Sequence, residues 1–390
     1  MQINKPENTL QNISVGSKEI NAARVAFFLP GFVISTWAPM IPMVKARLKL
    51  EADVLGLLLL CIGISAFIFM PLAGALVQRF GCKKVVITGA TLMPLISVLL
   101  SCLPNIWSYA IALAFFGAVM GATDVSMNTN AVIVERLAGR RLLSGMHAFW
   151  SIGCFASAGL FSVLASSSSN VTLIATLHCA IVLALLAVFG RHLLDYKSPG
   201  SEKAFAIPRG IVIVLGILAC ISFLVEGAVM DWSGVLLTEV KNMDIALAGT
   251  GYAIFSVAML IMRLLGDKTV QFLGEQKAVI GGSIVTAAGF ALVVVLDNLY
   301  LNAFAFILIG LGCANIVPVF YSLLKYQKGM PISAAVTSVT SLGYTGVILG
   351  PALLGFVAHG INISAVFELV ALLLVIEAGI AKYVFCKLKM

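Results

Sequence analysis

Charged residues are scarce in this chain, and their scarcity excludes an ordinary soluble protein. Only 11% of the 390 residues are Asp, Glu, Lys or Arg, whereas 61% are hydrophobic. A soluble domain has about 25% charged residues. With a mean hydropathy of +1.06, the chain has too little polar surface to cover a particle in water. We therefore expect an integral membrane protein whose main solvent is the lipid bilayer.

The sequence also lacks the motifs of common catalytic and metal sites. It contains no G-x-S-x-G, H-E-x-x-H or G-x-x-x-x-G-K-[ST] pattern, each of which positions a nucleophile, a metal or a nucleotide. The eight cysteines show no C-x-x-C spacing, and the four histidines have no metal-ligand spacing. We expect a protein that is not an enzyme, with no cofactor and no bound metal.

The hydrophobic residues gather into about twelve runs long enough to span a bilayer as helices. The runs show no period-two alternation, which excludes a β-barrel and predicts an all-α protein. The predicted spans are 24–44, 54–77, 85–103, 106–134, 144–167, 171–193, 210–236, 246–266, 278–296, 300–324, 332–358 and 361–386.

Loops rich in Lys and Arg alternate along the chain with loops that contain few of them. If both termini are cytoplasmic, 21 of the 25 basic residues fall on the cytoplasmic side. This bias is a strong positive-inside signal in a multi-pass protein of the cytoplasmic (inner) membrane. The net charge of +8 is thus explained by topology, and we expect no nucleic-acid partner.

The longest polar interruption, 194–209, divides the predicted spans into six and six. We therefore predict a cytoplasmic tail (1–23), a first six-helix bundle (24–193), a central cytoplasmic loop (194–209) and a second bundle (210–390). An offset of 193 residues aligns similar loop residues of the two halves, which supports a pseudo-symmetric repeat. The aligned pairs include Gln78 with Gln271, Gly81 with Gly274, and Lys84 with Lys277.

Two loop motifs carry a resemblance to a known family. The segment G-A-L-V-Q-R-F-G-C-K-K (74–84) and its counterpart R-L-L-G-D-K-T-V-Q-F-L-G (263–274) resemble the signature loop of the major facilitator superfamily. Gln78 stands where the family usually has Asp. Segments 31–42 and 226–233 resemble a poorly characterised bacterial branch near the fucose permeases.

The resemblance implies a transporter of twelve helices in two bundles that works by alternating access as a monomer. It further implies a cytoplasmic gate that latches the outward-facing state, formed by Arg79, Lys83, Arg263 and Asp267. Read from the residues alone, the basic side chains could equally be positive-inside anchors.

Carboxylates within predicted spans are costly and therefore mark candidate functional groups. Asp124 lies mid-helix with Asn128 one turn later on the same face, and Asn130 nearby. Glu226 lies near the middle of the seventh span. We predict that Asp124 and Glu226 are proton-coupling groups, and the alternative is a structural polar cluster. For Glu368 and Glu377, solvation near the interface or a salt bridge is the favoured interpretation.

Aromatic and amide side chains in other spans suit a sugar-type solute, because rings stack on apolar faces and amides bond hydroxyls. The predicted substrate-binding residues are Trp37, Asn128, Asn130, Trp150, Asn315 and Tyr344. Packing is the alternative role, above all for Trp37.

We therefore predict a secondary active transporter that moves a small polar solute, such as a sugar or sugar-like compound, together with protons. The alternative is proton-driven efflux of a lipophilic or cationic compound, and a non-transporting receptor is a third reading. The absence of a G-x-x-x-G-P motif in the fifth span disfavours efflux.

Overall fold

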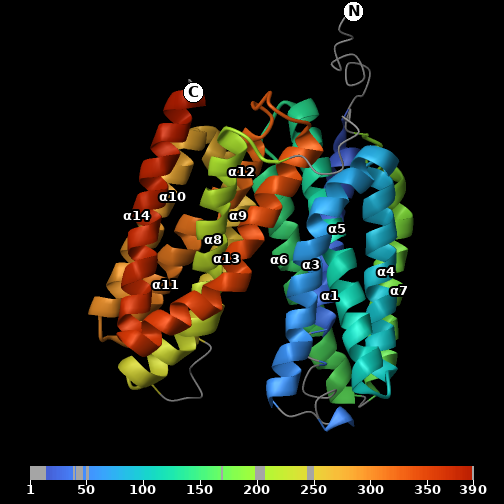
Figure 1. Cartoon of the computed structure of the whole chain (residues 1–390), viewed down its shortest axis with the longest axis horizontal. Coiled ribbons are helices and arrows are strands. Elements are labelled where there is room, and N and C mark those ends of the chain that lie inside the picture. The colour runs from blue at the N-terminus through green and yellow to red at the C-terminus, as the bar shows by residue number, and fades with distance from the viewer. Residues whose placement is uncertain are drawn as a thin grey trace, which may run out of the picture. The chain divides into compact units, whose positions relative to one another are not determined.

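The structure is a computed structural model that describes residues 15–37, 40, 47–49, 52–167, 170–197, 207–243 and 250–388. The described residues form helices connected by short turns, without a β-strand (Figure 1). Within a bilayer, a helix satisfies its own backbone hydrogen bonds, which explains why a chain this apolar folds entirely into helices.

The chain divides into two compact units. The first consists of Met1–Arg140, Met146–Ile207 and Met330–Thr337. The second consists of Arg141–Gly145, Pro208–Gly329 and Ser338–Met390. The short segment Arg141–Gly145 thus belongs to the second unit, although the chain on either side of it belongs to the first.

The described residues of the first unit contain six long helices and one short 3-10 helix. Asn105 and Asn170 begin two of these helices, because each side chain accepts a hydrogen bond from a backbone N–H of the first turn. Its core joins aromatic and aliphatic side chains of several helices. The elements are α1 (Ser17–Trp37), α3 (Ala52–Phe80), α4 (Cys82–Cys102), α5 (Ile106–Ala138), α6 (Leu143–Ser167), α7 (Val171–Phe189) and η3 (Gly190–His192).

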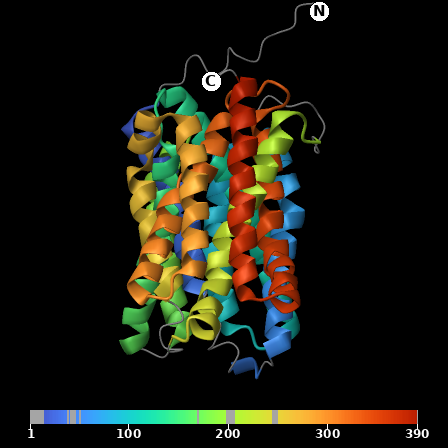
Figure 2. The same cartoon turned by 90° about the vertical axis from the view of Figure 1, so that its left-hand side faces the viewer.

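The helices of the second unit pack around buried rings, with Phe290 and Phe367 only 5.6 Å apart between ring centroids. In this unit α14 lies against α10 and α8 (Figure 2). The elements are α8 (Ile211–Val235), η4 (Leu236–Val240), α9 (Thr250–Leu273), α10 (Glu275–Val295), α11 (Leu299–Cys313), α12 (Ile316–Leu323), α13 (Ile332–Gly360) and α14 (Ile363–Leu388).

Among the described residues, ten helical stretches are long and apolar enough to cross a membrane. The two predicted spans outside those ten correspond to α1 and α9. The all-helical prediction is confirmed, and the observed helices follow the predicted runs in order. Large side chains such as Trp107, Ile111 and Phe356, which are 79%, 72% and 75% exposed, would face lipid in a membrane.

Two predicted spans differ from the observed helices for identifiable reasons. Helix α1 begins at Ser17 rather than at 24, because the charged residues Lys18 and Glu19 interrupt the apolar run but not the helix. The end of the predicted span 24–44 lies outside the described residues. The predicted span 300–324 consists of two helices, α11 and α12, which are separated at Ala314 and Asn315.

Candidate functional site

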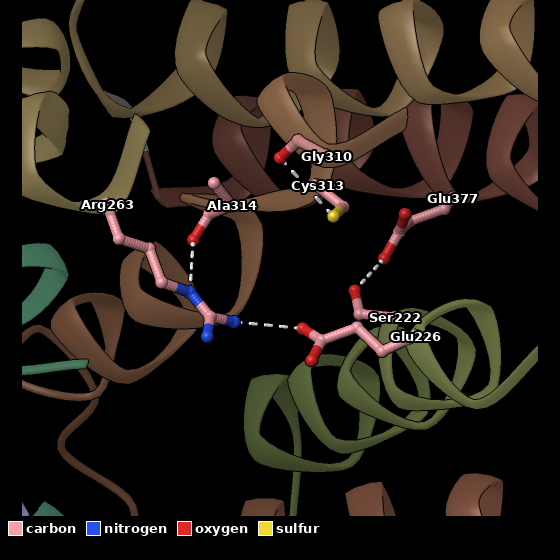
Figure 3. Close-up of polar contacts among 7 residues, drawn as sticks. All are labelled: Ser222, Glu226, Arg263, Gly310, Cys313, Ala314 and Glu377. Carbon is pink, nitrogen blue, oxygen red and sulfur yellow. Dashed lines mark hydrogen bonds and ion pairs between the residues drawn. The ribbon is translucent and has the colours of Figure 1, made fainter. Parts of the chain in front are cut away.

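A buried ion pair between α9 and α8 is the most prominent polar feature of the second unit. Arg263 Nη2 lies 3.0 Å from Glu226 Oε1, and the two side chains are 9% and 27% exposed. Arg263 Nε also donates to the backbone oxygen of Ala314 at 3.3 Å (Figure 3). The guanidinium therefore bridges a carboxylate and a carbonyl, which compensates the cost of burying its charge.

The carbonyl of Ala314 is available because of the proline four residues later. Proline has no N–H and its ring clashes with the carbonyl of residue i−4, so Pro318 cannot donate the hydrogen bond that the oxygen of Ala314 would accept in a regular helix. The helix is interrupted there and resumes with the bond from Val319 N to Asn315 O at 3.1 Å. Pro318 thus leaves the carbonyl of Ala314 without its helical hydrogen bond, and Arg263 donates to it instead.

Asn315 lies at the same interruption, and its side-chain oxygen Oδ1 is buried without a hydrogen-bond partner. This atom packs against Gly266 of α9, where an added Cβ would lie only 2.0 Å from it. A buried amide oxygen without a donor is costly. The predicted role of Asn315 in substrate binding stays a prediction, and this orphan acceptor could accept a bond from a solute hydroxyl.

Tyr344 of α13 lies close to the same helix face as Glu226. Its ring meets that of Phe223 edge-on, at 5.9 Å between centroids. Helices α13 and α8 approach closely because Gly346 lies against the backbone of Cys220; an added Cβ would be 2.1 Å from its carbonyl oxygen. The packing therefore places Tyr344 against Phe223, which precedes Glu226 by three residues in α8.

In the first unit, Asp124 lies inside α5 and is partly exposed. Asn128 Nδ2 bonds the backbone oxygen of Asp124 at 2.9 Å and its carboxylate Oδ1 at 3.4 Å. The predicted pairing on one helix face is thus present in the structure. The oxygen Oδ1 of Asn128 is buried and has no partner.

The other predicted polar residues of α5 point elsewhere. Asn130 donates to the backbone oxygen of Leu194 at 3.2 Å, which fastens α5 to the segment after η3. Thr123 bonds its own helix at Val119 O, 2.7 Å away. A role for Asn130 in substrate binding stays a prediction.

The two predicted tryptophans lie in α1 and α6. Trp150 is partly exposed, and its backbone packs against Gly31 of α1, where an added Cβ would lie 2.4 Å from Trp150 O. Trp37 is the last residue of α1, and its side chain lies outside the described residues. Both assignments to the substrate site stay predictions.

The comparison with known protein families decides the class of the chain. Residues 25–344 match the Major Facilitator Superfamily. The chain belongs to the major facilitator superfamily. The MFS transporter class predicted from the loop motifs is therefore confirmed, as is the expectation that the protein is a transporter rather than an enzyme.

The proteins that this chain resembles within the superfamily are described in different terms, as a transporter, a drug-resistance protein and a symporter. The chain is 39% identical to an uncharacterised MFS-type transporter of Yersinia pestis, over 96% of this chain and 98% of the relative. It is 24% identical to multidrug resistance protein 2 of Bacillus subtilis, over 91% of both chains. The solved structure of the Escherichia coli fucose:proton symporter superposes with a TM-score of 0.74 at 15% identity, covering 94% and 98% of the two chains. At that identity the likeness shows the MFS fold.

The four residues predicted to form the cytoplasmic gate of this MFS protein have separate partners. In the first unit, Lys83 donates to the backbone oxygen of Arg191 at 2.7 Å, and Arg79 lies over the ring of Phe80 at 5.2 Å. In the second unit, Arg263 takes part in the buried pair described above, one turn away from Asp267. The gate assignment stays a prediction.

Asp267 accepts a hydrogen bond from a backbone N–H of the segment Arg141–Gly145. Both of its carboxylate oxygens lie 3.2 Å from Gly145 N, in the first turn of α6, where a free N–H and the helix dipole favour an anion. Arg141 in the same segment forms an ion pair with Glu275 at the start of α10. Lys325 Nζ lies 3.8 Å from the same carboxylate.

Sequence reasoning missed the pairing of Arg141, Glu275 and Lys325. Their signal was weak, because each lies at a predicted loop, where charge is ordinary. Glu275 alone gave a signal that could have been noticed. It directly follows Gly274 in the second loop motif, whereas the corresponding residue after Gly81 in the first motif is the uncharged Cys82. Its side chain is only 2% exposed, so it acts as a buried anchor for two basic groups.

Sequence reasoning was also wrong about Glu377. Its side chain is fully buried, so solvation near an interface does not explain it. The hydroxyls of Ser222 and Ser283 donate hydrogen bonds to it, and it has no salt bridge within the described residues. Glu368 of the same helix is exposed, as the interface interpretation expects.

Proposed function

We propose that this MFS transporter is a proton-coupled symporter of a small polar solute, with Asp124 and Glu226 as the titrating groups. The observation that carries the proposal is the placement of these carboxylates. Asp124 of the first unit and Glu226 of the second are both partly buried within helices that are long and apolar enough to cross a membrane, and they lie beside an amide and a guanidinium group, respectively. Burying a carboxylate inside a membrane is energetically costly, and such residues usually have a function in transport or binding.

Glu226 provides a direct way to link protonation to binding. As a carboxylate it pairs with Arg263 at 3.0 Å. When it takes up a proton, the charge attraction is lost and the guanidinium is free to bind a solute oxygen. Asn315 Oδ1 and the ring of Tyr344 supply an acceptor and an apolar face in the same unit. This combination suits a solute with hydroxyl groups.

Within the described residues Asp124 forms no salt bridge, and it lies beside Asn128. A protonated carboxylic acid crosses a dehydrated state without the cost of a buried charge, and its release of the proton on the cytoplasmic side would reset the cycle. We therefore assign the principal coupling role to Asp124 and the solute-linked role to Glu226.

The test begins with a thermal-shift screen of hexoses, polyols and sugar acids on detergent-purified protein, since a bound ligand stabilises the folded state by mass action. The best stabilising solute is then offered to proteoliposomes with an acidic exterior. Symport predicts accumulation above the external concentration, which a protonophore abolishes. Equilibration without accumulation, unaffected by the protonophore, would contradict proton coupling.

A second candidate function is proton-driven efflux of a lipophilic or cationic compound. The likeness to multidrug resistance protein 2, at 24% identity, favours it. The carboxylates would then attract a cation as well as a proton. In the same proteoliposomes, efflux predicts that lipophilic cations accumulate when the interior is acidic, whereas symport requires an acidic exterior.

A further inference from the structure

Glu377 of α14 contacts two other helices of the second unit, α8 and α10. The proposed transport cycle gives this buried acid no role. Ser222 Oγ of α8 donates to Glu377 Oε1 at 2.6 Å, and Ser283 Oγ of α10 donates to Oε2 at 3.1 Å. All three side chains are buried, with exposed fractions of 0%, 3% and 0% for Glu377, Ser222 and Ser283. Two helices have therefore placed a hydroxyl against this carboxyl group.

The charges around Glu377 indicate which form it takes. The cation of the cluster, Arg263, is bound to Glu226, and no ion pair of the described residues includes Glu377. Cys313 of α11 lies within electrostatic range of Glu226, Arg263 and Glu377. One guanidinium and one carboxylate already balance, so the cluster is neutral when Glu377 carries a proton.

The residue that binds this buried acid lies one helical turn from the partly exposed one. Ser222 and Glu226 are four residues apart in α8, hence one turn apart on the same helix face. Figure 3 shows Glu226 directed toward Arg263 and Ser222 directed toward Glu377. A serine hydroxyl both donates and accepts hydrogen bonds, so it can pass a proton between groups on its two sides.

We propose that Glu377 is an internal proton-holding site that exchanges its proton with Glu226 through the hydroxyl of Ser222. This rests on the proposed function only in that Glu226 titrates during transport. Glu377 is thereby a third proton-binding group of the transport cycle, beside Asp124 and Glu226. It is buried and so protected from direct exchange with water.

The transfer step is a balanced relay of two protons. Once protonated, Glu226 is released from Arg263, turns toward Ser222 one turn away on α8 and gives its proton to Ser222 Oγ, while the hydroxyl proton of Ser222 passes to the carboxylate of Glu377. Glu226 becomes a carboxylate and pairs with Arg263, Ser222 remains a neutral hydroxyl, and Glu377 becomes a carboxylic acid. The reverse step returns the proton to Glu226 and releases Arg263.

Infrared spectroscopy of the purified, lipid-reconstituted protein can detect the proton without knowledge of the transported solute. A buried protonated carboxyl group has its own carbonyl stretching band. We expect this band near neutral pH in wild type and its loss in Glu377→Gln. The matched control is Glu368→Gln, the same substitution at an exposed position of α14, which should keep the band. A spectrum of Glu377→Gln identical to wild type overturns the proposal.

Exchange of the carboxyl proton for deuterium tests the relay itself, in variants that retain Glu377. Ser222→Ala should slow the deuterium shift of the band at least about tenfold, because one hydrogen-bonded step is removed, while Ser222→Thr keeps the hydroxyl and the rate. Ser283→Ala removes the other hydrogen bond of Glu377 but not the path, and should exchange like wild type. Equal slowing in both alanine variants would show a purely structural role and overturn the relay.

These outcomes are separable from failure of the proposed function. If no solute is ever accumulated with protons but the band and its Ser222-dependent exchange are present, the proton site stands and the transport assignment falls. If accumulation is observed while the band is absent, the transporter is proton-coupled without Glu377.

Discussion

At the scale of single residues, Asp124 is the group on which proton coupling most depends. Asp124→Asn keeps the shape of the side chain and its contact with Asn128 but cannot titrate. We expect it to abolish accumulation driven by a pH gradient while counterflow exchange of labelled solute persists, because exchange needs no net proton release. Glu368→Gln, at an exposed position, is the control. Wild-type accumulation in Asp124→Asn would make the polar pair in α5 structural.

The pair of Arg263 and Glu226 makes a second residue-scale prediction. Removing one partner leaves a buried Arg263 or a partly buried Glu226 without its counter-charge, so Arg263→Met or Glu226→Gln alone should each lower the melting temperature clearly. The double variant should recover part of the loss, with a coupling free energy of about 1–3 kcal/mol in a double-mutant cycle. Strictly additive losses in stability would mean that the two side chains do not interact in the folded protein.

At the scale of elements, the close packing of α13 on α8 depends on Gly346. An added Cβ would lie 2.1 Å from the carbonyl oxygen of Cys220, and backbone cannot move aside cheaply. Gly346→Ala should therefore destabilise the protein by about 1–3 kcal/mol, measured as a lower melting temperature in detergent. Gly281→Ala in α10 has open space around the new methyl group and should be neutral or slightly stabilising. Equal effects of both would refute this packing argument.

The helices themselves were largely predictable from sequence, because apolar runs of spanning length permit few alternatives in a bilayer. The interruption between α11 and α12 was not predicted, although Pro318 was visible, because a proline within an apolar run sometimes only kinks a helix. Helix α1 extends back to Ser17 because Glu19 accepts a hydrogen bond from Gly16 N at the helix start, where an anion is favourable, so charge there ends the hydrophobic run but not the helix.

The site was less predictable than the helices because its contacts are tertiary. Arg263 was assigned to a gate from its motif, and nothing in its spacing from Glu226 revealed the ion pair across 37 residues. Ser222 and Ser283 carry no sequence signal at all, since serine is common in helix interfaces. Only the fold brings them to Glu377, which sequence reasoning therefore misjudged.

At the scale of the whole molecule, the distribution of Lys and Arg predicts that both termini and the loop 194–209 are cytoplasmic. In a variant without native cysteines, Ser201→Cys should resist a membrane-impermeant thiol reagent in intact cells and react after permeabilisation. Ser201 lies outside the described residues, so its sequence position carries this prediction. Asp297→Cys, predicted to be external, is the positive control. Labelling of Ser201→Cys in intact cells would reverse the orientation.

Proton movement accompanying solute entry tests the central claim most directly. The solute selected by the thermal-shift screen is added to wild-type proteoliposomes in weakly buffered medium, and the external pH is recorded. Symport predicts that the medium becomes alkaline as solute enters, whichever way the protein is inserted, and that Asp124→Asn gives no such signal. Acidification would indicate exchange of solute for protons, as in efflux, and solute entry without any pH change would contradict proton coupling altogether.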